Sequence, residues 1–78
     1  EFASKMSPNP TNGMINYQSN VELSQIEIYS LNGISILLKK SDLGKEGMIN
    51  LENQPKGIYF ARLISKNSDA RIEKIILE

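Results

Sequence analysis

Short stretches of this chain alternate apolar and polar residues, which is typical of a strand with one buried face. Residues 14–18 illustrate the pattern, with Ile15 and Tyr17 on one face and Asn16 and Gln18 on the other. Helix signals are nearly absent. The same alternation predicts strands at residues 14–18, 21–23 with 26–29, 34–39, 48–51, 58–64 and 70–77, and residues 3–7 are a candidate seventh. The pattern therefore predicts an all-β fold, a small antiparallel β-sandwich of six or seven strands.

Turn residues separate these stretches. Residues 8–13 contain two prolines, which lack amide donors, so we expect a rigid connector at the edge of a sheet. Residues 30–33 end in Asn-Gly, a pair typical of tight hairpins. The alternation slips at residues 24–25, which indicates a bulge or a short turn. Three more polar segments are expected to be a loop at 41–47, a type I turn at 54–57 and a hairpin turn at 66–69.

Length and composition narrow the class of protein. A chain of 78 residues makes one domain with a thin core. Its nine basic and nine acidic residues cancel and are scattered, so neither nucleic acid nor membrane insertion is expected. The absence of cysteine favours the cytosol only weakly, because a domain carried on a larger exported protein needs no disulfide. Residues 1–6 begin with Glu-Phe, which a common cloning site encodes, so we interpret them as cloning-derived or linker sequence and the domain as residues 7–78.

Residue types able to carry out catalysis are few. Without histidine or cysteine, the chain has no Ser-His or Cys nucleophile and no imidazole or thiolate metal site. The acidic residues lie apart, and we interpret the nearest approach, Asp42 with Glu46, as solvated loop charges and not as a calcium site. We predict no catalytic residue, no metal and no cofactor. A very small esterase or nuclease that uses carboxylates alone is the least favoured alternative.

The aromatic residues do not form the exposed row with which a β-sandwich binds carbohydrate. Tyr59 lies inside a predicted central strand, so we expect it in the core. Tyr29 precedes a hairpin and is a candidate for exposure, but one ring is a poor platform for a sugar. A structural or adhesive module that binds a polysaccharide or a neighbouring domain stays open as the alternative function.

The last predicted strand is apolar on both faces at its end, in Ile75, Ile76 and Leu77. One interpretation is a terminal strand that is paired into a sheet. The other is that its free edge is offered to another protein by strand addition, or pairs two copies into a dimer. Lys74 and Glu78 would then guard an open edge against aggregation.

Four short motifs follow one another along nearly the whole chain from Ser7 onward. They are Pro8-Asn9-Pro10-Thr11-Asn12-Gly13, then Ile28-Tyr29-Ser30-Leu31-Asn32-Gly33, then Ile49-Asn50-Leu51 before Pro55-Lys56-Gly57-Ile58-Tyr59-Phe60, and Lys74-Ile75-Ile76. In this order they resemble the C-terminal sorting domain of type IX secretion cargo proteins in the Bacteroidetes. The residues that match the family motifs are Pro8, Asn9, Pro10, Gly13, Gly33, Gly57, Tyr59, Lys74 and Ile75.

The resemblance implies an Ig-like β-sandwich at the C-terminus of a larger exported protein, acting as a non-catalytic address label. In that family the cargo reaches the periplasm through a signal peptide, and the outer-membrane secretion machinery recognises its folded C-terminal domain. A sortase-like peptidase generally removes the domain and attaches many cargoes to the cell surface. The implied partners are this machinery, the peptidase and a fused N-terminal cargo domain. The implied location is the periplasm in transit, then the cell surface or the extracellular space.

The sequence departs from the family in two respects. Ser7 stands where the family often has an aromatic residue, and the cloning-derived or linker residues 1–6 stand upstream of the Pro8-Asn9-Pro10 run, where cleavage falls in the family, so we assign no cleavage site. We interpret several matched residues, above all the glycines, as residues that set the shape of the backbone. A Cβ atom at a positive φ costs about 1–2 kcal/mol. Replacing Gly57 by alanine is therefore predicted to destabilise the domain if Gly57 adopts a positive φ.

Overall fold

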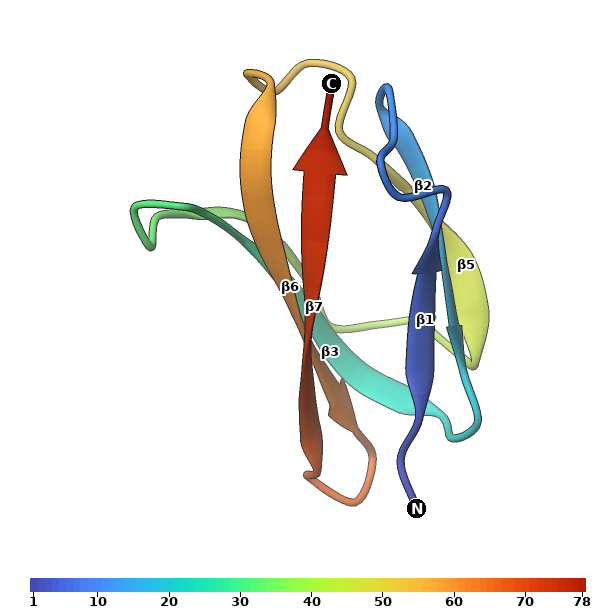
Figure 1. Ribbon diagram of the computed structural model, residues 1–78. Helices are drawn as coiled ribbons and strands as arrows, with labels where there is room; N and C mark the ends of the chain where they lie inside the picture. The colour runs from blue at the N-terminus through green and yellow to red at the C-terminus, as the bar shows by residue number, and fades with distance from the viewer.

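The computed structural model describes all 78 residues, with seven strands and no helix (Figure 1). The prediction of an all-β fold is confirmed, and no helix is present that is long and apolar enough to cross a membrane. In chain order the strands are β1 Ser4–Ser7, β2 Met14–Ser19, β3 Leu23–Ser30, β4 Ser35–Lys39, β5 Glu46–Asn50, β6 Gly57–Ser65 and β7 Ala70–Leu77.

The strands form two antiparallel sheets that face each other as the layers of a small β-sandwich (Figure 1). The smaller sheet has the order β1-β2-β5, and the larger sheet has the order β4-β3-β6-β7. The two chain ends lie at opposite ends of the sandwich, the N-terminus beside the β6–β7 turn and the C-terminus beside the loop before β6 (Figure 1). As predicted, β6 is a central strand, and β7 is paired into a sheet.

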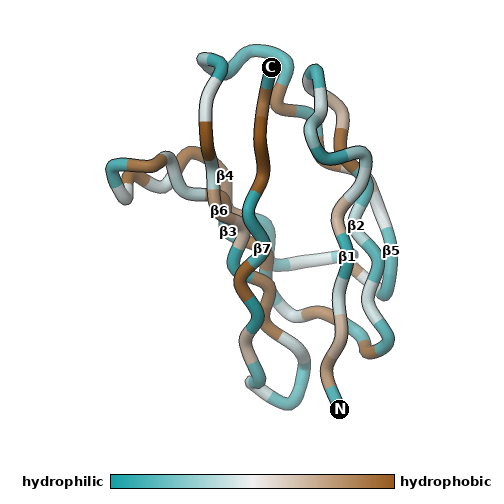
Figure 2. The backbone as a smooth tube through the Cα atoms, viewed as in Figure 1, coloured by the Kyte–Doolittle hydropathy of each residue, from teal (hydrophilic) through white to brown (hydrophobic).

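The core lies between the sheets and consists of alternate side chains from facing strands. Ile15 and Tyr17 of β2 point into it, and so do Tyr59 of β6 and Ile75 of β7. Figure 2 shows that the C-terminal half of β7 is strongly hydrophobic, while most loops are hydrophilic. The fourteen core residues are Met6, Ile15, Tyr17, Leu23, Ile26, Ile28, Leu43, Ile49, Leu51, Tyr59, Ala61, Leu63, Ile75 and Leu77.

The predicted irregularity at residues 24–25 is a bulge. The pairing of β3 with β6 shifts register between Leu23 and Gln25. The residues on both sides of the shift therefore belong to the same strand, β3, and not to two strands separated by a turn. The predicted hairpins around residues 30–33 and 66–69 are also present, since they join antiparallel neighbours β3–β4 and β6–β7.

Two predicted boundaries are wrong. β5 begins at Glu46, inside the predicted loop, because Gly47 pairs with Tyr17 across the smaller sheet instead of breaking the strand. The hydrogen-bonded turn before β6 spans residues 51–54, where the Gln54 amide donates to the Leu51 carbonyl at 3.0 Å, and not residues 54–57. In both places the prediction relied on a glycine or a proline as a sign of a turn, and the structure has no hydrogen-bonded turn at that residue.

The candidate seventh strand is present as β1. Met6 is buried and pairs with Tyr17 of β2, so residues 4–6 pack as part of the sandwich. The assignment of residues 1–6 to cloning-derived or linker sequence, and the domain boundary at residue 7, remain predictions.

Candidate functional site

Eight of the nine residues predicted to match the family motifs, although far apart in sequence, lie at the end of the sandwich that carries the C-terminus. Gly57 pairs with Leu77 across β6 and β7, and Tyr59 pairs with Ile75. The loop between β1 and β2 reaches the same end through Asn9, which bonds to β7. We call this group of eight residues the terminal cluster: Pro8, Asn9, Pro10, Gly13, Gly57, Tyr59, Lys74 and Ile75.

Asn9 binds the backbone of β7 with both ends of its side-chain amide. Its Nδ2 donates to the Lys74 carbonyl at 2.5 Å, and its Oδ1 accepts from the Ile76 amide at 2.9 Å. These two bonds replace those that a neighbouring strand would make at this edge. The side chain of Asn9 therefore holds the tail of the chain in place.

Thr11 continues the same edge with backbone bonds. Its amide donates to the Ile76 carbonyl at 2.9 Å, and its carbonyl accepts from the Glu78 amide at 2.9 Å. Together with the Asn9 side chain, this short parallel pairing covers the C-terminal half of the outer edge of β7. The last strand is an edge strand, as strand addition requires, but that half of its edge is already occupied.

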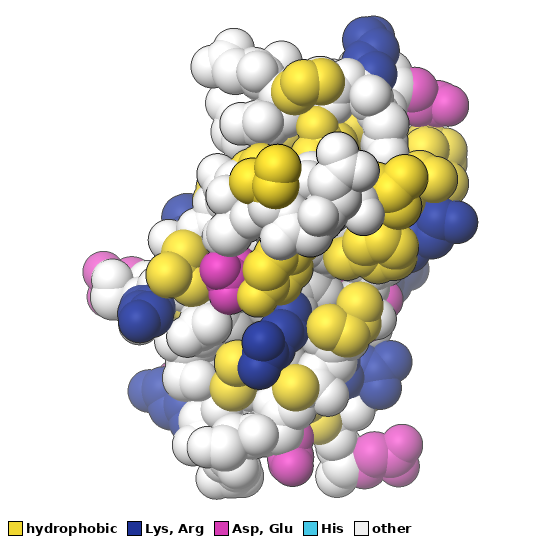
Figure 3. Space-filling model, turned by 90° about the vertical axis from the view of Figure 1, so that its left-hand side faces the viewer, with side chains coloured by type: hydrophobic (Ala, Val, Ile, Leu, Met, Phe, Trp, Pro, Cys, Tyr) yellow, Lys and Arg dark blue, Asp and Glu magenta, His cyan; other side chains and the backbone are white.

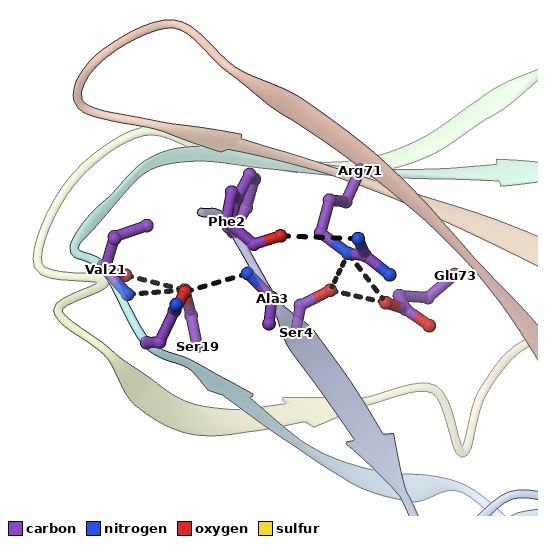
Figure 4. Close-up of polar contacts among 8 residues, drawn as sticks. Phe2, Ala3, Ser4, Ser19, Val21, Arg71 and Glu73 are labelled. Carbon is purple, nitrogen blue, oxygen red and sulfur yellow. Dashed lines mark hydrogen bonds and ion pairs between the residues drawn. The ribbon is translucent and has the colours of Figure 1, made fainter.

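The remainder of the β7 edge is tied to β1 by side chains (Figure 4). Arg71 Nε donates to Ser4 Oγ at 3.0 Å, and the Ser4 hydroxyl donates to the Glu73 carboxylate. Arg71 Nη1 also donates to the Phe2 carbonyl at 3.3 Å, and Arg71 forms an ion pair with Glu73 at 3.6 Å. The two sheets are thus joined along the whole of this side of the sandwich.

Gly13 anchors the proline-containing loop to the turn before β6. Its carbonyl accepts from the Leu51 amide at 2.8 Å, and its α-carbon packs against Glu52 so closely that a Cβ would lie 2.3 Å from Glu52 Cγ. Its amide donates to Thr11 Oγ1 at 3.1 Å. Because a side chain does not fit here, glycine at this position is a requirement of packing as well as of backbone conformation.

Tyr59 closes the loop that leads into β6. Its ring is 4% exposed, as the core prediction required, and its hydroxyl donates to the Pro55 carbonyl. Gly57, at the start of the strand, has a φ of +149° and no neighbour within 4 Å of the place where a Cβ would stand. Gly33 is the one matched residue outside the terminal cluster, since it lies at the tip of the β3–β4 hairpin.

Thr11 and Ile76 also hold the proline-containing loop against β7, but they were not among the predicted site residues. Both lie within the motifs from which those residues were chosen. Thr11 is 2% exposed, and its hydroxyl donates to the Met14 carbonyl at 2.5 Å. A threonine two residues before a glycine is a local signal for such a side-chain turn. No local sequence pattern indicates that the backbone of Thr11 bonds to that of Ile76.

Replacing Asn9 by alanine removes two hydrogen bonds to β7 while it leaves those of the Thr11 backbone. We expect the free energy of unfolding to fall by about 1–3 kcal/mol, the sum of two ordinary hydrogen bonds. Urea denaturation of the variant and the parent measures the change. Asn67→Ala is the matched control, because Asn67 is exposed at the opposite end and its side chain makes no hydrogen bond. Equal midpoints for the two variants would contradict the role of Asn9.

The rest of the surface offers little for small-molecule chemistry. A hollow of about 600 Å³ is lined mainly by polar residues of β1, β2 and the start of β5, and by no residue of the terminal cluster. No group of three or more acidic residues lies close enough together to hold a metal ion. Burial raises the pKa of the Tyr17 hydroxyl, which donates to the Leu43 carbonyl at 2.8 Å in the interior. The site is therefore a shaped surface of backbone, proline and amide groups.

Comparison with known families agrees with this geometry. A family model described as the secretion system C-terminal sorting domain matches residues 5–78. None of the curated proteins compared matches the chain. Domains of this family are C-terminal signals for type IX secretion, which delivers proteins to the cell surface or the extracellular space. With the match extending over nearly all of its length, the chain belongs to the secretion system C-terminal sorting domain family and carries the signal for type IX secretion.

Proposed function

We propose that the exposed part of the terminal cluster, held in shape by the buried Tyr59 and Ile75, is the surface by which the outer-membrane machinery of type IX secretion reads this sorting domain, and that the domain acts without catalysis. The observation that carries the proposal is the contact between Asn9 and β7. It joins the first and last family motifs, which are 65 residues apart in sequence. The joined surface exists only when the domain is folded, so a machinery that reads it selects folded domains.

The position of the chain ends supports a cargo fused at the N-terminus. The N-terminus lies at the end of the sandwich opposite the terminal cluster (Figure 1), so a fused domain leaves the cluster accessible. In this proposal the cargo and its sorting domain cross the periplasm, and the machinery binds the terminal cluster at the outer membrane. A sortase-like peptidase then cuts upstream of the domain and attaches the cargo to the cell surface.

The alternative of an adhesive module has no observation in its favour. Tyr17 and Tyr59 are buried, and Tyr29 and Phe60, which pair across β3 and β6, are both half-buried, so these aromatic residues form no exposed row for a sugar. A dimer formed through β7 would first have to displace residues 9–11 from the C-terminal half of its edge. The terminal cluster thus favours reading by the machinery over self-pairing.

Reporter fusions test the proposal. A periplasmic reporter fused before residue 1 is expected outside the cell or on its surface in a host with type IX secretion, while the reporter alone stays inside. The same reporter fused after Glu78 covers the terminal cluster and is expected to remain inside, although the domain folds. Retention of the N-terminal fusion would contradict the sorting function. Equal export of both fusions would contradict the terminal cluster as the surface that is read.

Deleting residues 74–78 is not a clean test of reading. The deletion removes Ile75 and Leu77 from the core and also the partner of Asn9, so it should unfold the domain. The proposed removal by a peptidase has its own readout in the same cells. An immunoblot of the exported N-terminal fusion should show the reporter without the domain, and a reporter that keeps it would contradict removal.

A further inference from the structure

The outer face of the larger sheet is largely apolar on β4, β6 and β7, although no other part of the chain covers it. β3 lies between β4 and β6 and places Gln25, Glu27 and Tyr29 on the same face. Side chains that alternate with the core positions on β4, β6 and β7 point away from the smaller sheet. Figure 3 shows hydrophobic side chains gathered on this side of the molecule. Ile72 is 59% exposed and Leu38 is 48% exposed, and the others are half-buried. We call this surface the outer apolar face: Leu38, Ile58, Phe60, Ile64, Ile72 and Ile76.

The outer face of the smaller sheet differs. Polar residues such as Lys5, Asn16, Gln18 and Asn50 occupy the equivalent positions there. Met48 is the one large exposed hydrophobic residue on that side. An exposed apolar patch is therefore not a general property of this sandwich, and contiguous patches of this kind mark interaction surfaces.

Of the two cations on the outer apolar face, Lys74 has no acidic partner. It lies opposite Phe60 and takes part in neither of the two ion pairs of the structure, whereas Arg62 lies between Ile72 of β7 and Glu27 of β3. The nearby acid, Glu27, has its carboxylate engaged by two hydroxyl donors, Tyr29 and Ser35, each at 2.7 Å. These bonds, with a smaller contribution from the Arg62 and Lys40 charges, hold the pKa of Glu27 below its ordinary value, so Glu27 stays ionised and offsets the charge of Arg62.

The outer apolar face is also continuous with the terminal cluster. Lys74 belongs to both, and the backbone of Ile76 is held by Asn9 while its side chain lies on the face. From the end of the sandwich the surface runs along β6 and β7. A partner that reads the terminal cluster is thus positioned to contact this face.

We propose that the outer apolar face docks onto an apolar protein surface of the secretion machinery that carries a carboxylate opposite Lys74. The inference rests on the proposed function and adds to it the chemistry of the partner. Burial of the apolar residues supplies the attraction, and the unpaired Lys74 selects a carboxylate at the border. A second copy of the chain fits less well, because the carboxylate that it would bring on this face, Glu27, is already engaged by Tyr29, Ser35 and Arg62.

A matched pair of double variants tests the docking face. Ile72→Asp with Lys74→Glu alters the outer apolar face, and Met48→Asp with Lys5→Glu makes the same chemical changes on the smaller sheet. The apolar residues are comparable, since Ile72 is 59% and Met48 is 55% exposed. Both double variants change the net charge equally. Each is placed in residues 1–78 behind the periplasmic reporter, and urea denaturation confirms that each folds.

Export of the reporter is expected to fall by at least about tenfold for the first double variant and by less than about twofold for the second, as for loss of a central contact in an interface. Leu38→Asp, on β4, tests the same face without altering β7 and is also expected to reduce export. If the parent fusion is exported and the folded variants on the outer apolar face are exported equally well, the proposal that this face docks onto the machinery is wrong. Failure of the parent fusion itself would instead overturn the proposed function.

Discussion

Replacing Gly13 by alanine is expected to lower the free energy of unfolding by about 2–4 kcal/mol, from backbone strain and overpacking together. Its φ of +150° is a conformation that a side chain disfavours. A Cβ there would also lie 2.3 Å from Glu52 Cγ and 3.2 Å from Glu52 Cα, so the turn after β5 has to move. The Leu51 amide, bonded to the Gly13 carbonyl, resists that movement. A domain of this size has only about 4–12 kcal/mol of stability to lose.

Gly57→Ala is the matched control, because it shares the backbone conformation without the contact. Its φ is +149°, which meets the condition set by the sequence, but nothing lies within 4 Å of its Cβ position. We expect a loss of about 1–2 kcal/mol from strain alone. Urea denaturation of the two variants then isolates the packing contribution at Gly13. If both variants unfold at the same midpoint, the turn at Glu52 yields freely and the packing argument is wrong.

Local alternation was sufficient to predict most of the strands. The last strand was expected at residues 70–77, and β7 spans Ala70–Leu77. Ile15 and Tyr17 were expected on one face, and both lie in the core. These features are encoded by neighbouring residues, because each second position of a strand meets the same environment. A glycine such as Gly47 interrupts that signal without interrupting the strand, which is why the start of β5 was missed.

The candidate site could be predicted only in part. Its residues came from motifs in a known order, and eight of the nine meet at one end of the sandwich. The bonds that join them could not be predicted, because Asn9 and Lys74 are 65 residues apart and no local pattern pairs a loop side chain with a distant strand edge. For the same reason, the sequence left open whether the edge of the last strand is free. The tertiary fold supplies its partner from the proline-containing loop.

The isoleucines of β7 separate a structural role from a role in recognition. Ile75 is 0% exposed and pairs with Tyr59, whereas Ile72 on the same strand is 59% exposed. Replacing Ile75 by alanine is expected to cost about 2–5 kcal/mol, because it removes a buried side chain and leaves a cavity between the sheets. Replacing Ile72 by alanine is expected to change the free energy of unfolding by less than about 0.5 kcal/mol.

Urea denaturation and reporter export should be measured on the same two alanine variants. We expect Ile75→Ala to be the less stable variant and Ile72→Ala to be the less exported one. Ile75→Ala should shift the denaturation midpoint, and at temperatures where it is still folded it should be exported normally, because its side chain is not on the surface. Ile72→Ala should unfold like the parent yet be exported less. A stable Ile75→Ala variant would contradict the packing of the tail against the core. If Ile72→Ala is stable and is exported normally, the machinery does not recognise the outer face of the larger sheet.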